Sequence, residues 1–373
     1  MPPLVATALA LEPWVDWIEQ DQEVQGVGYS QFGAPWNLDR VDQTSPNLSQ
    51  SYDYPVGASG VNVYVVDSGI SSAHTDFQGR ASLDFTAVND GFGADDCAGH
   101  GTSVASAIGG STYGIAKKAL LHSVRVLECS NRGSVSQLLQ GLDWVLANAS
   151  SPAIANMSVT VEGGSLLVDA AVQRLVDAGI PTVVAAGNGS RDACLESPGR
   201  LPAVITVGGS APGDWMYSFS DYGSCVDLFA PADSVEVATN ANPTSHGVGS
   251  GTSFASPLVA GAAAMYLAWQ PGAAPASVAS ALIANATNGA LRNLPANSAN
   301  RLLFVNFIPS CGTGLEMCAG TCVDLLSSSR NCGTCGRVCV GGGARCRDDA
   351  GNIYFAGTMC MGGRCVSRSC DLP

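Results

Sequence analysis

The sequence predicts an α/β fold with a mostly parallel central sheet, followed by a small disulfide-rich module. Short β-branched runs alternate along the chain with segments of helical spacing, which is the pattern of parallel sheets. Of the 14 cysteines, ten fall within residues 311–373. Because the 373 residues are 46% hydrophobic and only 13% charged, the chain can bury a large core.

The predicted strands are short, apolar and rich in β-branched residues. In chain order they cover residues 60–70, 119–129, 152–159, 180–188, 203–209 and 225–231. The first ends in Asp67-Ser68-Gly69, and the fourth ends in Asn188. Functional groups of parallel sheets collect at the carboxyl ends of strands, so Asp67 and Asn188 are candidate site residues.

The predicted helices show apolar residues at helical spacing between these strands. They cover residues 134–149, 165–179, 253–270 and 275–286. The third is apolar on nearly all faces, which indicates a helix buried in the middle of the domain. Pro257 follows Ser253 within about one turn, where we expect its missing N–H to cost least.

The cysteine-rich end indicates a disulfide scaffold in an oxidising compartment, with a boundary near residues 308–311. A zinc module is the rival, because Cys332, Cys335 and Cys339 are closely spaced. No histidine lies in this segment, and ten thiols exceed one tetrahedral site, so disulfides are favoured over metal.

The bulk properties oppose two classes of partner. A net charge of −14 opposes nucleic-acid binding, which requires a basic surface. No run of 18 apolar residues is present, so no membrane span is expected. The first residues include a short apolar stretch without a basic region before it, which makes a poor signal peptide.

One serine and one histidine stand out as candidates for nucleophilic catalysis. Ser253 opens the buried helix within "GSGTSFASPLVAGAA", and the positive end of the helix dipole favours an oxyanion there. An imidazole base must come from His74, His100, His122 or His246. His122 lies inside a strand pattern, whereas His100 lies between glycines at a helix start. A lone histidine in such a turn is more often structural than catalytic.

The order of the candidates adds information that no single residue carries. Asp67, His100 and Ser253 follow one another as they do in subtilisin, and differently from two unrelated serine hydrolase folds. The GxSxG elbow of lipase-like α/β hydrolases is missing, because alanine stands where its second glycine belongs.

Four blocks, "VVDSGI", "GHGTSVA", "AAGN" and "SGTSFASPLVAG", resemble the signature blocks of the subtilase family, and most of all its aqualysin-like proteinase K branch. The resemblance spans residues 29–307 and implies a subtilisin-like three-layer fold. It implies Ser253 as the nucleophile, His100 as its base and Asp67 as the orienting carboxylate. Asn188 and the N–H of Ser253 would stabilise the oxyanion.

The same resemblance implies disulfides and calcium. Cys97 would pair with Cys129, and Cys194 with Cys225. One calcium site would use the carbonyls of Pro202 and Val204 with the carboxylate of Asp227, and a second would use Asp39, Asp42, Gln43 and Ser49. The alternative for Asp39 and Asp42 is an exposed turn.

The substrate-binding segments depart from the family pattern. Residues 156–164 read "NMSVTVEGG", where Thr160 replaces a glycine and Glu162 adds charge, so the preferred side chain is open. Ser158, Val159 and Thr160 would form one wall of the cleft, and Asn131, Arg132 and Gly133 the other. Both walls would bind a peptide as an added strand.

The two ends of the chain resemble further modules. Residues 15–24 resemble the last strand of an inhibitory propeptide, so we expect residues 1–28 to be its remnant in a truncated precursor, with cleavage at Gly28–Tyr29. An ordinary amphipathic extension is the alternative. Residues 311–370, with the core "NCGTCG", resemble a Stig1-like module that would bind a wall or matrix component or stiffen the end.

These observations predict a secreted, monomeric serine endopeptidase with structural calcium, protein or peptide substrates and its own propeptide as inhibitor. The expected domains are residues 1–28, 29–308 and 309–373. A second hypothesis is a catalytically inactive scaffold that acts as an extracellular binding protein through its cysteine-rich tail.

Overall fold

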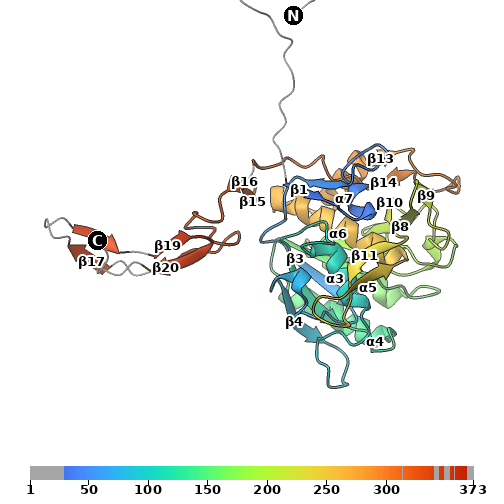
Figure 1. The fold of residues 1–373 in the computed structure, drawn as a ribbon. Helices are drawn as coiled ribbons and strands as arrows, with labels where there is room; N and C mark the ends of the chain where they lie inside the picture. The colour runs from blue at the N-terminus through green and yellow to red at the C-terminus, as the bar shows by residue number, and fades with distance from the viewer. Residues whose placement is uncertain (1–28, 313, 340–343, 348–352, 357, 368–373) are drawn as a thin grey trace, which may run out of the picture.

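The computed structural model describes residues 29–312, 314–339, 344–347, 353–356 and 358–367 (Figure 1). The predicted propeptide remnant, residues 1–28, lies outside this part of the chain. Within the described residues, no helix is both long and apolar enough to cross a membrane.

One twisted sheet forms the centre of the molecule, as predicted. Its parallel core has the order β10-β8-β7-β6-β3-β5-β4. The bounds are β3 (Asn62–Asp67), β4 (Ala81–Thr86), β5 (Leu120–Arg125), β6 (Ala153–Met157), β7 (Thr182–Ala185), β8 (Ile205–Ala211) and β10 (Leu228–Pro231). At the edges lie β14 (Arg301–Leu302), parallel to β10, and the antiparallel β13 (Thr287–Asn288) and β9 (Trp215–Met216). The six predicted strands are all present; five are shorter than predicted, and β8 has the predicted length but begins and ends two residues later.

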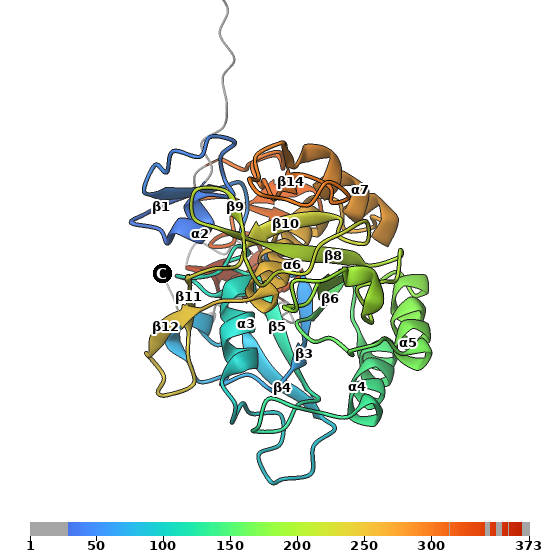
Figure 2. The same ribbon diagram turned by 90° about the vertical axis from the view of Figure 1, so that its right-hand side faces the viewer.

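Helices cover both faces of this sheet and make the predicted three layers (Figure 2). On one face lie α3 (His100–Gly109), α6 (Thr252–Trp269) and α7 (Pro275–Asn285), which share a buried cluster with Val63 and Val65 of β3. On the other face, α4 (Val135–Asn148) and α5 (Leu166–Asp177) pack on Tyr64 and Val66. Successive side chains of a strand point to opposite faces, so β3 serves both clusters.

The starts of α4 and α5 follow the capping rules for helices, and α6 contains a proline. Ser134 and Gln137 form a capping box at α4, and the Ser165 hydroxyl accepts from the N–H of Val168 at α5. The expectation for Pro257 was wrong. This residue is sixth in α6, beyond the first turn, so its missing N–H removes a helix hydrogen bond.

Several short elements carry no periodic signal long enough to be predicted. They are β1 (Tyr29–Phe32), α2 (Trp36–Asp39), β2 (Ser51–Tyr54), the 3-10 turns η1 (Thr75–Phe77) and η2 (Ala193–Leu195), β11 (Val235–Ala238) and β12 (His246–Gly249). β1 pairs with β2, and β11 with β12.

The described residues of the cysteine-rich segment form three antiparallel strand pairs that extend away from the sheet (Figure 1). They are β15 (Glu316–Cys318) with β16 (Thr321–Val323), β17 (Ala344–Arg347) with β18 (Ile353–Ala356), and β19 (Thr358–Met361) with β20 (Arg364–Ser367). Disulfides join Cys311–Cys322, Cys318–Cys335, Cys332–Cys360 and Cys339–Cys365. The three cysteines of the zinc alternative are therefore bonded to sulfur and offer no thiolate.

The start of this segment is anchored on the protein body. Glu316 is 1% exposed, accepts from the N–H of Gly57 at 2.8 Å and pairs with Lys118 Nζ at 2.6 Å. Met317 belongs to the same buried cluster as α3 and α6. Gly57 precedes β3, whereas Asp67 ends it. The tail is therefore attached near the amino-terminal ends of the strands, opposite to their carboxyl ends.

Candidate active site

The predicted site residues gather where the parallel sheet reverses its strand order. β3 lies between β5 and β6, and the chain passes from β5 on one side of β3 to β6 on the other. A cleft of about 590 Å³ opens beyond the carboxyl ends of these strands and is lined by both His100 and Ser253. Ligands of open α/β sheets bind at such a point.

Asp67 and His100 are in direct hydrogen-bond contact. Asp67 ends β3 and His100 begins α3, and His100 Nδ1 lies 2.7 Å from Asp67 Oδ1. The carboxylate is fully buried, and the imidazole is 18% exposed. With Nδ1 engaged by the carboxylate, Nε2 is the ring nitrogen left to exchange a proton.

A buried carboxylate that the sequence analysis missed holds these two elements together. Asp96 Oδ1 accepts from Ser68 Oγ at 2.9 Å, and Asp96 Oδ2 accepts from the N–H of Thr102 at 2.8 Å. Ser68 Oγ in turn accepts from the N–H of Gly101 at 2.9 Å. Only glycine fits at position 101, because a Cβ there would lie 2.2 Å from the carbonyl oxygen of Gly69. An aspartate shortly before a predicted helix start was the available signal.

The surroundings of His100 raise the pKa of its imidazole above the ordinary value. Burial is the largest influence and lowers the pKa, but the charge and hydrogen bond of Asp67, together with the charge of Asp96, outweigh it. The imidazole therefore binds a proton more readily than a free histidine does.

Ser253 lies at the positive end of α6, as expected. Gly251 is the N-cap of the helix with φ +138°, a conformation that side chains rarely adopt. Ser253 Oγ donates to the carbonyl oxygen of Ser158 at 3.4 Å. The hydroxyl is thus hydrogen-bonded to the wall of the cleft in this structure.

Asn188 is oriented by the start of the same helix. It lies three residues beyond β7 rather than at its end, and its Oδ1 accepts from the N–H of Thr252 at 2.8 Å. Because the oxygen faces the helix, the amide Nδ2 is the end left to donate elsewhere.

The residues predicted to form the two walls all line the cleft. The cleft is lined by Val126, Leu127, Asn131, Arg132, Gly133, Ser134, Val135 and Leu138 on one side, and by Ser158, Val159, Thr160, Val161 and Glu162 on the other. Residues 131–133 and 158–160 belong to no strand here. Glu162 is 79% exposed and pairs with Arg191 at 2.9 Å, so its charge has a partner beside the cleft.

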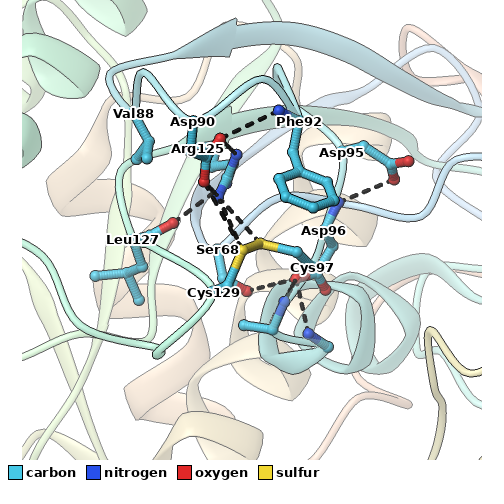
Figure 3. The surroundings of a disulfide bond; sticks show 12 residues. Ser68, Val88, Asp90, Phe92, Asp95, Asp96, Cys97, Arg125, Leu127 and Cys129 are labelled. Atoms are coloured by element: carbon cyan, nitrogen blue, oxygen red, sulfur yellow. Dashed lines mark hydrogen bonds and ion pairs between the residues drawn. A yellow bond between two sulfur atoms is a disulfide. The ribbon is translucent and has the colours of Figure 1, made fainter.

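A disulfide and a buried arginine connect one wall to the helix of His100 (Figure 3). Cys97 and Cys129 are bonded, as the family resemblance implies, and so are Cys194 and Cys225. The fully buried Arg125 side chain lies against the first bridge and donates to Asp90 Oδ1 at 2.8 Å and to the carbonyl of Leu127 at 3.2 Å. Arg125 therefore joins the loop before His100 to the start of the wall.

The second predicted calcium site contains a pair of buried acids. Asp39 and Asp42 are 1% and 6% exposed. Burial raises the pKa of Asp42 to about 7, and the neighbouring charges of Asp39 and Asp53 add to the rise although the N–H of Asp53 opposes it. Ser49 donates to Asp39, whereas the Gln43 amide donates to the carbonyls of Ser45 and Asn47. Buried acidic oxygens fit a hard cation.

The first predicted calcium site contains one acid, Asp227, whose pKa is also raised by burial. Burial raises the pKa of Asp227 to about 6, against the N–H of Thr206 and the charge of Arg301, which lower it. Pro202 and Val204 belong to the loop before β8. The N–H of Thr206, near the start of β8, donates to the Asp227 carboxylate at 2.8 Å. The donor set of carbonyl and carboxylate oxygens suits calcium.

The other three histidines do not line the cleft. His122 stacks on Tyr64 and bonds Asn62, and His74 bonds the carbonyl of Ser245. His246 lies on β12 beside Tyr113. Of the four histidines, His100 alone lines the cleft that Ser253 also lines.

A sequence profile described as the subtilase family matches residues 58–302. An extracellular serine proteinase of Thermus sp. (strain Rt41A) is 48% identical over 299 residues, which are 80% of this chain and 72% of that protein. Alkaline serine exoprotease A of Vibrio alginolyticus is 41% identical over 309 residues, 82% of this chain and 57% of that protein.

The fold agrees with a solved structure. A crystal structure of a cold-adapted subtilisin-like serine proteinase matches with a TM-score of 0.71 and 40% identity, over 73% of this chain and 98% of the other.

Proposed function

The chain belongs to the subtilase family of serine endopeptidases, and from that premise we propose how its cleft hydrolyses a peptide bond. Ser253 Oγ attacks the scissile carbonyl while His100 Nε2 takes the hydroxyl proton. His100 then returns that proton to the leaving amine, and water hydrolyses the resulting acyl-enzyme. Asp67 keeps the imidazole in the required tautomer and stabilises its charged form.

Two donors would stabilise the oxyanion of the tetrahedral intermediate. They are Asn188 Nδ2 and the backbone N–H of Ser253, both at the positive end of α6. The substrate would lie extended between residues 131–133 and 158–160 and add a strand to each wall. The apolar lining of the cleft, which includes Leu127, Val135 and Leu138, suits apolar side chains before the cut.

The observation that carries this proposal is the 2.7 Å contact between His100 and the buried Asp67, in the cleft that Ser253 also lines. A fluorophosphonate probe tests it. We expect covalent labelling of Ser253, read by peptide mass spectrometry, and hydrolysis of casein that Ser253→Ala abolishes without a change in the melting temperature. Labelling of another serine, or casein hydrolysis by Ser253→Ala, would overturn the assignment.

The remaining assignments are proposals of the same kind. We propose that the enzyme is secreted, as the names of its relatives suggest, that residues 1–28 derive from an inhibitory propeptide, and that residues 29–308 form the peptidase domain. Structural calcium would bind at Asp39 and Asp42, and at Asp227. Residues 309–373 would form a Stig1-like module with a wall or matrix ligand.

The alternative of an inactive scaffold finds no support, because the relatives are serine proteinases and the Asp67–His100 pair is intact. A lipase-like hydrolase is opposed by the subtilisin-like fold.

A further inference from the structure

The carbonyl oxygen of Ser253 cannot be hydrogen-bonded by its own helix in the usual way. In an α-helix, this oxygen accepts from the N–H four residues later. That residue is Pro257, which lies inside α6 and has no N–H. A buried carbonyl left without a donor would cost free energy, so the structure must supply one from elsewhere.

Ser158 supplies this donor from the opposite wall of the cleft. Its Oγ donates to the carbonyl oxygen of Ser253 at 2.9 Å. In return, Ser253 Oγ donates to the carbonyl oxygen of Ser158 at 3.4 Å. Ser158 directly follows β6, so the two residues connect the end of the sheet to the start of α6 across 95 positions of sequence.

The Ser158 hydroxyl forms hydrogen bonds with three other residues. A hydroxyl offers one proton and two lone pairs, and a carbonyl can only accept, so the proton of Ser158 belongs to the bond with Ser253. Asn156 Nδ2 donates to Ser158 Oγ at 3.1 Å, and Ser256 Oγ, 3.0 Å away, then also donates to it. Ser158 is 6% exposed, and the other two are fully buried. The one proton and both lone pairs of the Ser158 hydroxyl are therefore engaged.

We propose that the Ser158 side chain is a positioning residue for the nucleophile, an inference that rests on the proposed role of Ser253. Its hydroxyl replaces the helix bond that Pro257 removes and so holds the backbone of Ser253 against the wall of the cleft. That backbone carries both the attacking Oγ and one oxyanion donor. Displacement of about 1 Å at such a position can cost roughly 100-fold in rate.

Ser158→Ala tests the proposal through the split between kcat and KM. On peptide anilide substrates we expect kcat to fall about 10- to 100-fold, with KM changed less than about threefold, because the wall's backbone still binds substrate. The matched control is Ser106→Ala, which removes a buried serine hydroxyl that bonds Asp76 and the N–H of Ala238 away from the cleft. Ser106→Ala should lower the melting temperature without lowering kcat.

The decisive comparison adds Pro257→Ala, which provides an N–H for the carbonyl of Ser253. If the Ser158 hydroxyl substitutes for that bond, Ser158→Ala should lower kcat less than about threefold in the Pro257→Ala background. An equal loss of kcat in both backgrounds, or unchanged kcat in folded Ser158→Ala, would overturn the proposal.

Failure of the proposed function would give a different result. Each variant is first titrated with the fluorophosphonate probe. If the wild-type protein is not labelled at Ser253, the nucleophile is elsewhere and the assignment itself fails. Labelling of the wild type together with unchanged kcat in Ser158→Ala would overturn only the positioning role.

Discussion

Asn188 Oδ1 accepts a hydrogen bond from the N–H of Thr252, the first residue of α6 and the neighbour of Ser253. This bond attaches the loop after β7 to the helix of the nucleophile and directs the amide Nδ2 away from that N–H. The bond therefore fixes the position of Asn188 relative to Ser253, as the two proposed oxyanion donors require.

Replacing Asn188 by leucine should remove one donor to the oxyanion. We expect kcat on peptide anilides to fall about 100- to 1,000-fold with little change in KM, because the lost bond forms only as charge develops. A rise in KM at constant kcat would show instead that Asn188 binds the ground state.

Asp67→Asn should change both the rate and its pH dependence. The asparagine amide favours the wrong tautomer of His100, and we expect kcat to fall about 10,000-fold. Asp67 also raises the pKa of His100, and the base must be neutral to accept a proton. The wild-type kcat/KM should therefore rise with pH through a pKa above about 6.5. In Asp67→Asn this rise should move to lower pH, and an unmoved profile would contradict the role of Asp67.

Asp90→Asn tests whether the buried Arg125 supports the cleft wall. The substitution leaves the Arg125 charge without its carboxylate, so we expect a lower melting temperature and a higher KM, because the Leu127 carbonyl is held by the same guanidinium. The control is Asp143→Asn, which breaks the exposed ion pair with Arg174 and should leave both quantities nearly unchanged. An unchanged KM in Asp90→Asn would show that the contacts of Arg125 with Asp90 and Leu127 do not support substrate binding.

The raised pKa of Asp42 should make the free energy of unfolding fall as the pH rises, and calcium should remove this fall. Its pKa in the folded protein is about 7, above its ordinary value of 3.8, so the native state binds more protons between these values. In EDTA, the free energy of unfolding of Ser253→Ala should therefore decrease from about pH 4 to about pH 7. Added calcium should remove the decrease, and Asp42→Asn should flatten it. The free energy of unfolding is measured by urea unfolding at each pH, in Ser253→Ala with and without Asp42→Asn. An equal change with pH in these two proteins would argue against the raised pKa of Asp42.

Glu316→Gln tests the attachment of the tail. The amide oxygen can still accept from Gly57, but the charge that pairs with Lys118 is lost. In the Ser253→Ala background, we expect faster release of the cysteine-rich segment by added trypsin and a lower melting temperature. Casein hydrolysis by the active form should change little, because Ala268, which bonds Gly320 of the tail, lies roughly 22 Å along α6 from Ser253.

The long elements of the fold were predictable because their patterns are local. Every predicted strand and helix is present, since an apolar pattern over seven or more residues reports which side chains are buried. The hairpins β1–β2 and β11–β12 were not predictable, because four-residue strands at an edge carry too few positions for a pattern. Asn188 was assigned to a strand end for a similar reason, because the apolar run continues past Ala185 into the loop.

The sequence alone determined the residue types of the site and their order, because Asp67, His100, Asn188 and Ser253 each lie in a short block that is read without knowing its neighbours. The tertiary structure decided what surrounds them. The bond of Ser158 to Ser253, the bond of Ser68 to Asp96 and the bond of the buried Arg125 to Asp90 join segments distant in sequence. Such contacts depend on how the strands align and on which carbonyl a proline leaves unpaired, and neither is visible until the chain has folded.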